Sequence, residues 1–193
     1  MKDKISECLV NAVENYTVIS QDKVLQEKIK KCVDVSVSAF RTDNKILFCG
    51  NGGSASDAQH IAAELSGRFY FDRPPLYAEA LHVNSSYITA VANDHGYEKT
   101  YCRMVEAAGR KGDVLVALST SGNSNNVIQA IEQAKKIGML TIGFTGNKGG
   151  QMKNICDIVL SIPSDDIPRI QEGHILIGHI LCQLIEEEMF SDA

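Results

Sequence analysis

The sequence predicts one α/β domain over residues 1–193, built on a doubly wound, five-stranded parallel sheet with flanking helices, and a helical extension over residues 1–42. Short, nearly unbroken apolar runs alternate with stretches of helical periodicity, and such runs are typical of parallel strands covered on both faces. A chain of 193 residues is within the usual size of one domain. Its 44% hydrophobic and 22% charged residues exclude disordered, collagen-like and coiled-coil classes.

The first 42 residues carry two helical patterns. Apolar residues recur at three- and four-residue steps over 4–19 and 22–41, with a break near Gln21. The valines in 33–37 also alternate as in a strand, but the longer helical pattern outweighs them. Helices outside an α/β core often cover a sheet edge or form an oligomer interface. We therefore expect both helices to pack on the core and on neighbouring subunits.

From Lys45 onward, strand and helix patterns alternate. The second predicted strand is the weakest because Glu79 and His82 interrupt it; the five are 45–50, 76–83, 113–118, 139–144 and 158–162. The segments between them predict helices over 54–65, 85–92, 97–109, 125–137 and about 168–189. Gly138 is suited to end the fourth helix, and Pro168 to the first turn of the last.

Composition and charge exclude several classes of function. The 19 basic and 24 acidic residues give a formal charge of −5, which disfavours a protein that binds nucleic-acid phosphates. No apolar run approaches the roughly 20 residues of a membrane helix, and the first residues lack the apolar stretch of a secretory signal. The six cysteines are scattered, without a Cys-x-x-Cys pair. We expect a cytoplasmic protein with reduced thiols, no nucleic-acid partner and no membrane contact.

Two strand-to-helix turns are suited to a phosphorylated ligand, because ligands bind at the carboxyl ends of parallel strands. The first, Cys49 to Ser56, has glycines that let the backbone approach a ligand, and it begins a helix whose free N–H groups favour an anion. It matches no nucleotide-binding motif, and an ordinary glycine-rich turn is an equal alternative.

The second turn, Ser119 to Ser124, places four hydroxyl groups between a strand and a helix. One or two hydroxyls would suit a helix N-cap, but four favour a phosphate or sugar site. A third candidate, Asn93-Asp94, offers donors and acceptors for sugar hydroxyls. By itself it predicts an ordinary turn.

Two helices carry side chains that can do chemistry. His60 and Glu64 are four residues apart, on one face of their helix. They could hold a metal ion or act as acid and base, although one isolated pair is more often a surface pair.

The last helix is apolar on most sides and yet contains Gln171, Glu172, His174 and His179. Each buried polar group without a partner costs roughly 1–3 kcal/mol, so several together favour a site over satisfied core histidines. The spacing of these residues does not decide which side chains would bind a metal ion. Gln171 and His179 are about 12 Å apart along the axis, His174 is a rival, and glutamine is not a usual zinc ligand.

Taken in order, these segments resemble the bacterial phosphoheptose isomerases, which are sedoheptulose 7-phosphate isomerases of the flavodoxin-like sugar isomerase (SIS) fold. The resemblance runs from about residue 45 to 188 and rests on Cys49-Gly50-Asn51-Gly52-Gly53-Ser54, Asp57-Ala58-Gln59-His60 with Glu64 and Gly67-Arg68, Asn93-Asp94, Ser119 to Ser124, and Arg169-Ile170-Gln171-Glu172 with His174 and His179. Where some members have Asp before the arginine, this chain has Pro168, so a contact made by that Asp is not carried over.

The resemblance implies an aldose–ketose isomerase that converts sedoheptulose 7-phosphate to D-glycero-D-manno-heptose 7-phosphate. That reaction is the first step of nucleotide-activated heptose biosynthesis, which feeds lipopolysaccharide, capsule or another glycoconjugate. The resemblance also implies a homotetramer with active sites between subunits, and one zinc ion per subunit held by His60, Glu64, Gln171 and His179. It assigns acid and base to Glu64 and His179, and substrate contacts to Asn51, Gly52, Gly53, Glu64, Asn93, Asp94, Ser119, Thr120, Ser121, Ser124 and Gln171.

The implied chemistry agrees with the residues. A ketose becomes an aldose through an enediolate when one group moves the carbon-bound proton and another moves the oxygen-bound proton. A carboxylate and an imidazole suffice, and zinc could polarise the carbonyl oxygen. A metal-bound carboxylate is a weaker base, so the two roles of Glu64 conflict unless Glu64 or His179 leaves the metal or the metal mainly organises the site.

The runner-up function is a non-catalytic SIS-fold binding protein of the DnaA-binding regulator type. That protein resembles this chain around the glycine turn and the Arg-Ile-Gln-Glu segment, but it lacks the equivalents of Glu64 and His179. Both residues are present here, which favours the enzyme. Sugar-phosphate sensors and N-acetylmuramic acid 6-phosphate lyases of the same fold are longer or carry a DNA-binding domain, for which this chain leaves no room.

Overall fold

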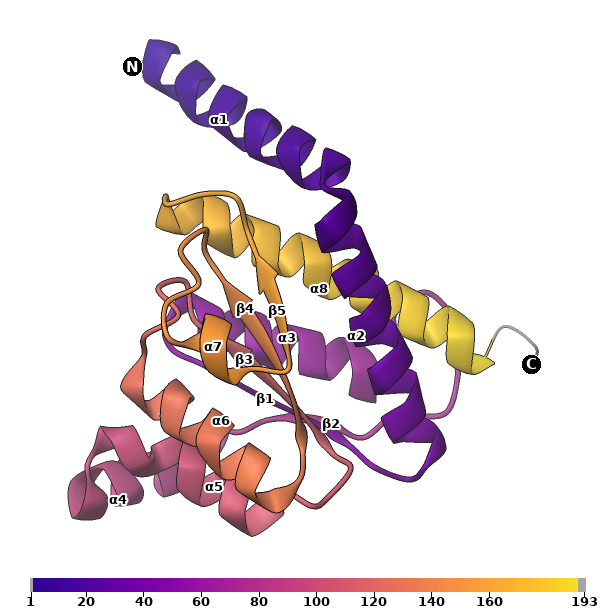
Figure 1. Ribbon diagram of the computed structural model, residues 1–193, viewed down its shortest axis with the longest axis vertical. Helices are drawn as coiled ribbons and strands as arrows, with labels where there is room; N and C mark the ends of the chain where they lie inside the picture. The colour runs from indigo at the N-terminus through magenta and orange to yellow at the C-terminus, as the bar shows by residue number, and fades with distance from the viewer. Residues whose placement is uncertain (1, 191–193) are drawn as a thin grey trace.

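The computed structural model describes residues 2–190, and within them the strands form a five-stranded sheet whose neighbouring pairs are all parallel (Figure 1). The strands are β1 (Ile46–Gly50), β2 (Ala78–Ala80), β3 (Val114–Leu118), β4 (Leu140–Thr145) and β5 (Ile158–Ser161). Their spatial order, β2-β1-β3-β4-β5, confirms the predicted doubly wound sheet. β2 is shorter than the predicted 76–83, because only its three residues pair with β1 at the sheet edge.

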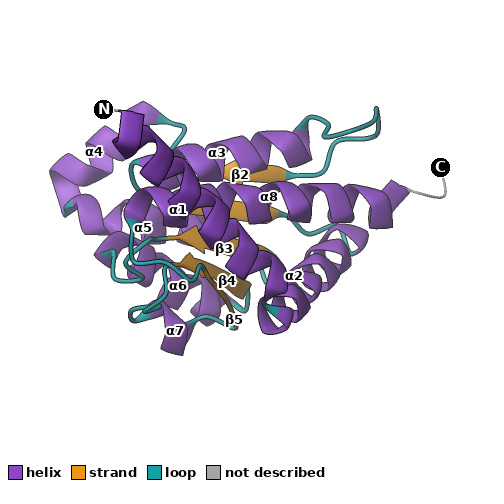
Figure 2. Ribbon diagram, turned by 90° about the horizontal axis from the view of Figure 1, so that it is seen from above, coloured by secondary structure: helices purple, strands orange, loops and turns teal. Residues whose placement is uncertain are grey.

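Helices cover both faces of the sheet (Figure 2). One face carries α2 (Lys23–Arg41), α3 (Gly53–Ser66) and α8 (Ile167–Phe190), and the other carries α5 (Thr100–Ala108), α6 (Asn125–Ile137) and α7 (Met152–Ile155). Successive strand residues point to opposite faces. Phe48 therefore packs in the cluster of the first face, and Cys49 in that of the second.

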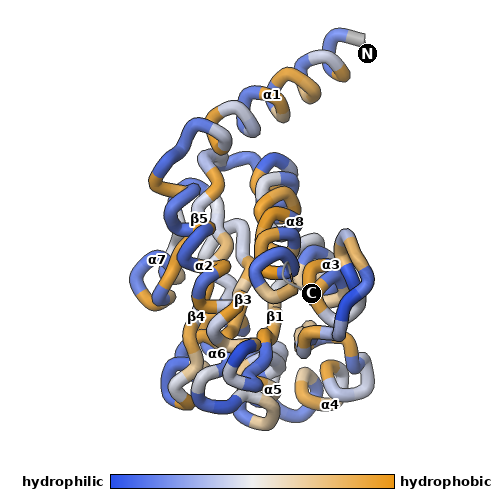
Figure 3. The backbone as a smooth tube through the Cα atoms, turned by 90° about the vertical axis from the view of Figure 1, so that its right-hand side faces the viewer, coloured by the Kyte–Doolittle hydropathy of each residue, from blue (hydrophilic) through white to orange (hydrophobic). Residues whose placement is uncertain are grey.

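The first helix, α1 (Lys2–Gln21), extends beyond the rest of the molecule (Figure 1). Asn15 and Ile19, in its second half, are buried, whereas much of its apolar surface is exposed, at Ile5, Leu9, Val10, Val13 and Val18. Figure 3 shows apolar residues along this projecting helix. The predicted break between the helices is confirmed: Asp22 caps α2, and its side chain accepts a hydrogen bond from Leu25 N at 2.9 Å.

Three helical segments also differ in detail from the sequence predictions. α4 (Ser85–His95) continues beyond the predicted 85–92. The stretch 97–109 divides into a 3₁₀ turn (Tyr97–Lys99) and α5. α7 was not predicted, because its four residues are too few to display a helical period.

Both ligand turns lie where the winding of the sheet reverses. β1 and β3 are neighbours, and their last residues, Gly50 and Leu118, are paired. After β1 the chain enters α3 on one face, and after β3 it enters α6 on the other. Open parallel sheets bind ligands at this switch point. The fold thus brings the glycine turn and the Ser119–Ser124 loop to one edge.

Among the described helices, none combines the length and the apolar composition needed to span a membrane.

Candidate active site

The glycine turn lets α8 approach the start of α3. Gly52 adopts a φ of +56° and precedes the first residue of α3. A Cβ on Gly53 would overlap the side-chain amide of Gln171. Gln171, in the second turn of α8, therefore lies directly against the beginning of α3.

Asn51, between β1 and α3, has a fixed side chain. Its Nδ2 donates to Asn126 Oδ1 at 2.9 Å, and Asn126 Nδ2 donates to Asn51 Oδ1 at 2.9 Å. The Tyr97 hydroxyl also donates to Asn51 Oδ1, at 3.0 Å. Asn126 is buried in the first turn of α6, so this pair links the two ligand turns.

In the Ser119–Ser124 loop, the hydroxyls face one another instead of capping a helix. Ser124 is the N-cap residue of α6, yet within residues 2–190 its side chain makes no capping hydrogen bond. Its Oγ lies 2.9 Å from Ser119 Oγ, and Ser119 Oγ lies 3.4 Å from Ser121 Oγ. This arrangement weakens the N-cap alternative, because the hydroxyls remain able to bind a ligand at the helix N-terminus.

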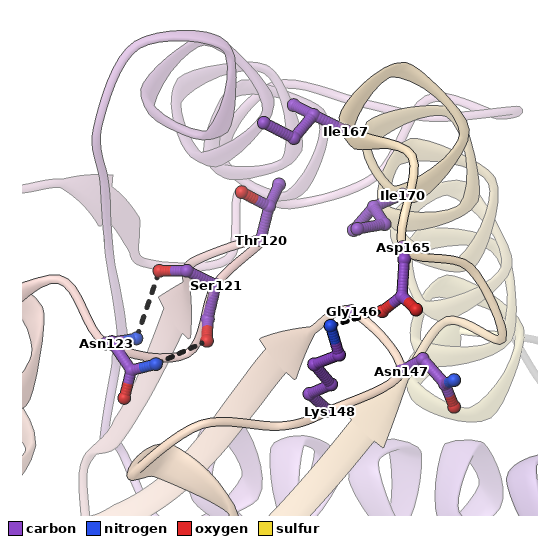
Figure 4. Close-up of a pocket in the computed structure, with 9 residues that line it drawn as sticks. All are labelled: Thr120, Ser121, Asn123, Gly146, Asn147, Lys148, Asp165, Ile167 and Ile170. Atoms are coloured by element: carbon purple, nitrogen blue, oxygen red, sulfur yellow. Dashed lines mark hydrogen bonds and ion pairs between the residues drawn. The ribbon is translucent and has the colours of Figure 1, made fainter.

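The loop also borders a cavity of about 300 Å³ between the ends of β3 and β4 and the start of α8 (Figure 4). The cavity is lined by Thr120, Ser121, Asn123, Gly146, Asn147, Lys148, Asp165, Ile167 and Ile170. Lys148 Nζ lies 3.8 Å from Asp165 Oδ1 at its rim, and both side chains are largely exposed. In the described part of the chain, neither Glu64 nor His179 lines this cavity. The cavity therefore adjoins the Ser119–Ser124 loop and is not part of the predicted acid–base site.

Three titratable side chains converge where α3 packs beside α8. His60 Nε2 lies 2.9 Å from His179 Nε2 and 3.4 Å from Glu64 Oε1. The two imidazole rings meet edge to face, 5.1 Å apart. The predicted pairing of His60 with Glu64 on one helix face is confirmed, and α8 adds His179 to it. A carboxylate and two imidazoles in contact can bind a metal ion or move protons.

The surroundings of this trio are partly apolar. The Phe69 ring, in the loop after α3, lies 5.8 Å from the His179 ring. Cys182 Sγ, one turn beyond His179, lies 3.9 Å from the carbonyl oxygen of Ile61. The trio is nevertheless accessible to solvent, since the His60 and Glu64 side chains are 47% and 26% exposed. A substrate could therefore reach these side chains.

Comparisons with known proteins agree with this geometry. The model of the SIS domain family matches residues 13–146. The phosphoheptose isomerase of Clostridium acetobutylicum is 47% identical over 192 residues, which is 100% of this chain and 98% of the relative. The chain belongs to the phosphoheptose isomerase family. It is an isomerase with the SIS fold.

Solved structures of this family superimpose closely on the chain. The phosphoheptose isomerase of Neisseria gonorrhoeae is 38% identical with a TM-score of 0.90, and the match covers 96% of this chain and 98% of that one. The phosphoheptose isomerase of Francisella tularensis is 37% identical with a TM-score of 0.92, and the match covers 96% and 97%. The fold of the family therefore extends over nearly the whole chain.

The structure of this family member brings together three of the four side chains expected to bind zinc. His60 contacts both Glu64 and His179. Gln171 lies instead against Gly53, and in residues 2–190 no hydrogen bond joins it to the other three. Gln171 and His179 are eight residues apart on α8, and the distance expected from that spacing accounts for the separation.

His174, the rival ligand, faces the sheet. It is fully buried, and its Nε2 donates to the carbonyl oxygen of Thr145 at 3.1 Å. Its Nδ1 has no hydrogen-bond partner among the described residues. Burial lowers the pKa of His174 to about 4, despite the opposing hydrogen bond to Thr145. His174 is therefore a neutral core histidine.

Asn93 and Asp94 lie in the last turn of α4, so the prediction of a turn at these residues was wrong. The helix continues to His95, where Gly96 with a φ of +89° ends it. Both side chains are exposed, and Asn93 Nδ2 donates to Asp94 Oδ1 at 2.8 Å. In the described part of the chain neither side chain is hydrogen-bonded to the trio or to the ligand turns, so their expected substrate contact stays a prediction.

Sequence reasoning did not single out Asp57, one turn before His60. Burial raises the pKa of Asp57 to about 6, although nearby His60 lowers it. Its Oδ2 is buried without a hydrogen-bond partner in residues 2–190. Its place at the start of the Asp-Ala-Gln-His segment, on the turn preceding His60, was the signal that could have found it.

Proposed function

We propose that this phosphoheptose isomerase family member converts sedoheptulose 7-phosphate to D-glycero-D-manno-heptose 7-phosphate. The observation that carries the proposal is the contact of His60 with both Glu64, on α3, and His179, on α8. Glu64 and His179 are the residues that distinguish the enzyme from the non-catalytic binding protein of the same fold. Their convergence supports the catalytic function.

The trio contains one group for each proton that the reaction moves. The ketose loses a proton from C1 while its carbonyl oxygen gains one, which gives the enediol. The hydroxyl on C1 then loses its proton and C2 gains one, so no proton is lost or gained overall. The Glu64 carboxylate and the His179 imidazole divide these tasks. His60, hydrogen-bonded to His179, holds that imidazole in place.

The phosphate end of the substrate is bound by the Ser119–Ser124 loop. The side chains of Ser119, Ser121 and Ser124 form a cluster of hydroxyls at the N-terminus of α6. The helix N-terminus adds backbone N–H groups and a favourable dipole for an anion. These donors suit phosphate oxygens without a buried cation.

Zinc is part of this proposal, and the donor set fits it. Two imidazole nitrogens and a carboxylate are the ligands of many catalytic zinc sites. No three His, Cys, Asp or Glu side chains in residues 2–190 already surround a metal position, and the His60 and His179 nitrogens are only 2.9 Å apart. His60, Glu64 and His179 would hold the ion, and the two imidazoles, which are in direct contact here, would have to separate to admit it. When bound, zinc would polarise the substrate carbonyl oxygen.

The proposal includes a homotetramer with active sites between subunits. The exposed apolar residues of α1, which stands clear of the sheet, support such an interface. Asn93 and Asp94, exposed on α4, are expected to reach substrate in that assembly. The remaining parts of the proposal are a cytoplasmic location and a product that enters heptose biosynthesis for lipopolysaccharide, capsule or another glycoconjugate.

Proton NMR of sedoheptulose 7-phosphate with the pure protein in D₂O tests the function. We expect a new aldoheptose anomeric signal, with deuterium at C2. A product that carries protium at C2 would mean that the proton removed from C1 is delivered to C2 without exchange with solvent, and would revise the proton-transfer mechanism only. An unchanged spectrum, with and without added zinc, would contradict the function and favour the non-catalytic binding protein.

A further inference from the structure

A buried ion pair joins the loop after α3 to the C-terminal half of α8. Arg73 Nε donates to Glu186 Oε2 at 2.9 Å, and the two side chains are 1% and 0% exposed. The sequence gives no sign of this pair, because Glu186 begins a run of three glutamates that is typical of a solvated helix end.

The Arg73 guanidinium closes the C-terminus of α3. Its NH2 group donates to the carbonyl oxygen of Glu64 at 3.0 Å, and its NH1 group donates to those of Leu65 at 2.8 Å and Gly67 at 3.1 Å. The last carbonyls of a helix lack partners within the helix and require such donors. α3 ends at Ser66, so Glu64 itself lies in the last turn, where helices fray.

The Glu186 carboxylate holds the loop from the other side. It accepts hydrogen bonds from the backbone N–H of Tyr70 at 2.7 Å and of Phe69 at 2.9 Å, in addition to Arg73. Burial alone would raise the pKa of Glu186, but these hydrogen bonds together lower it. The carboxylate is therefore ionised at neutral pH, and the Phe69 backbone is fixed beside α8.

These contacts converge on the catalytic pair. Glu186 lies seven residues after His179, which places both on one face of α8, two turns apart. Phe69, held by Glu186, packs its ring beside the His179 imidazole. Arg73, held by Glu186, binds the carbonyl of Glu64. One ion pair thus joins the helix turn that carries Glu64 to the helix that carries His179.

We propose that Arg73 and Glu186 are positioning residues that set the place of Glu64 relative to His179. The inference rests on the proposed function. Replacing a buried ion pair by apolar residues is often neutral for stability, so the pair is not explained by stability alone. A fixed last turn of α3 explains it, because general acid–base catalysis depends on geometry before pKa.

Glu186→Gln and Arg73→Lys test the proposal, with Asp113→Asn as the matched control. Gln removes the charge of the acceptor, and Lys keeps the buried charge while losing the fork that spans the carbonyls. The Asp113 side chain is also 1% exposed, and it forms an ion pair with Lys45 Nζ at 2.6 Å. It lies just before β3, however, at the amino-terminal end of the strands, whereas the ligand turns lie at their carboxyl ends.

We expect Glu186→Gln and Arg73→Lys to lower kcat at least tenfold with KM within twofold of wild type. All three variants are expected to lower Tm to a similar extent, but Asp113→Asn is expected to leave kcat within twofold of wild type. Folding is checked by Tm and circular dichroism, and Arg73→Lys serves where Glu186→Gln does not fold. Wild-type kcat in a folded variant, or an equal loss in Asp113→Asn, would overturn the proposal.

A second readout does not depend on turnover or on a metal. In the metal-free protein with ¹⁵N-labelled histidine, the His60–His179 hydrogen bond gives its two Nε2 resonances distinct shifts. We expect this signature to be lost in both folded variants and kept in Asp113→Asn, while its survival in the variants would overturn the proposal. Absence of turnover in the wild type would refute the proposed function alone, since the histidine resonances would still decide the positioning.

Discussion

Asn51 and Asn126 hold each other's side-chain amides, each Nδ2 donating to the other's Oδ1 at 2.9 Å. The pair joins the turn after β1 to the first turn of α6, across the switch point of the sheet. Asn126 Oδ1 also accepts from Val127 N at 3.0 Å, so its amide is fixed from both ends. The turn expected to contact the sugar and the loop expected to contact the phosphate are therefore held in one geometry.

Replacing Asn126 by alanine is expected to raise KM for the sugar phosphate, because Asn51 would lose its buried partner. Leaving such a partner unpaired costs about 1–3 kcal/mol, so Tm is also expected to fall. Tyr97→Phe is the milder comparison, since it removes a single donor to Asn51 Oδ1 and keeps the ring. Steady-state kinetics and thermal unfolding check both variants, and a wild-type KM in folded Asn126→Ala would refute the link.

Glu64→Gln and His179→Gln are each expected to lower kcat by at least about 10²-fold, since a positioned acid or base contributes roughly 10²–10⁴-fold. Glutamine keeps hydrogen-bonding capacity in both places, so the fold and the oligomer are expected to survive. Glu187→Gln is the control, because Glu187 is an exposed carboxylate of α8 paired with Gln183. Near wild-type turnover in either site variant, measured where size exclusion gives the same oligomeric state as wild type, would remove that residue from its role.

The sheet could be predicted because its information is local. The runs that form β1, β3 and β4 are apolar at nearly every position, and their burial on both faces follows from that pattern. β2 was predicted too long because the sequence run does not show that, at the edge of the sheet, only Ala78 to Ala80 pair with β1. That both ligand turns meet at the switch point follows from the strand order in the structure, which the sequence did not supply.

The site could be predicted only where its residues share a helix or a motif. The spacing of His60 and Glu64 indicated one face, and the structure confirms their contact. Spacing also warned that Gln171 and His179 lie far apart on α8, and Gln171 does lie apart from the trio. The partners of Asn51 and Glu186 are 75 and 113 residues away in the sequence, respectively, and no local pattern connects residues at such distances.

Ser124→Ala is expected to raise KM with little loss of stability. An N-cap serine that bonds the helix contributes about 0.5–2 kcal/mol, but the Ser124 hydroxyl faces Ser119 and not the N–H groups of α6. Asp22→Ala is the comparison, because Asp22 does cap its helix, through Leu25 N at 2.9 Å. Chemical denaturation should show a cost of about 1 kcal/mol for Asp22→Ala and less for Ser124→Ala. An unchanged KM in Ser124→Ala would argue against a phosphate contact there.

His174 makes stability depend on pH in a defined direction. Its pKa is about 4 in the folded chain against 6.5 for the ordinary group, because burial disfavours the imidazolium. Between these values the unfolded chain binds more protons than the folded one, so stability falls as pH drops from 6.5 towards 4. The full effect is about 3 kcal/mol, at 1.36 kcal/mol per pKa unit. Asp57, with its raised pKa, acts in the opposite direction over part of this range.

The His174 contribution is isolated by comparing wild type with His174→Leu. Leucine is expected to lower stability at pH 7.5, since the Thr145 carbonyl loses its donor, but to remove the loss that histidine causes on acidification. The free energies of unfolding of the two proteins should therefore converge between pH 6.5 and 4.5, measured by denaturant titration at one fixed protein concentration. Parallel pH profiles would show that His174 is protonated as readily in the folded chain as in the unfolded one, which a fully buried imidazole beside Phe144 does not permit.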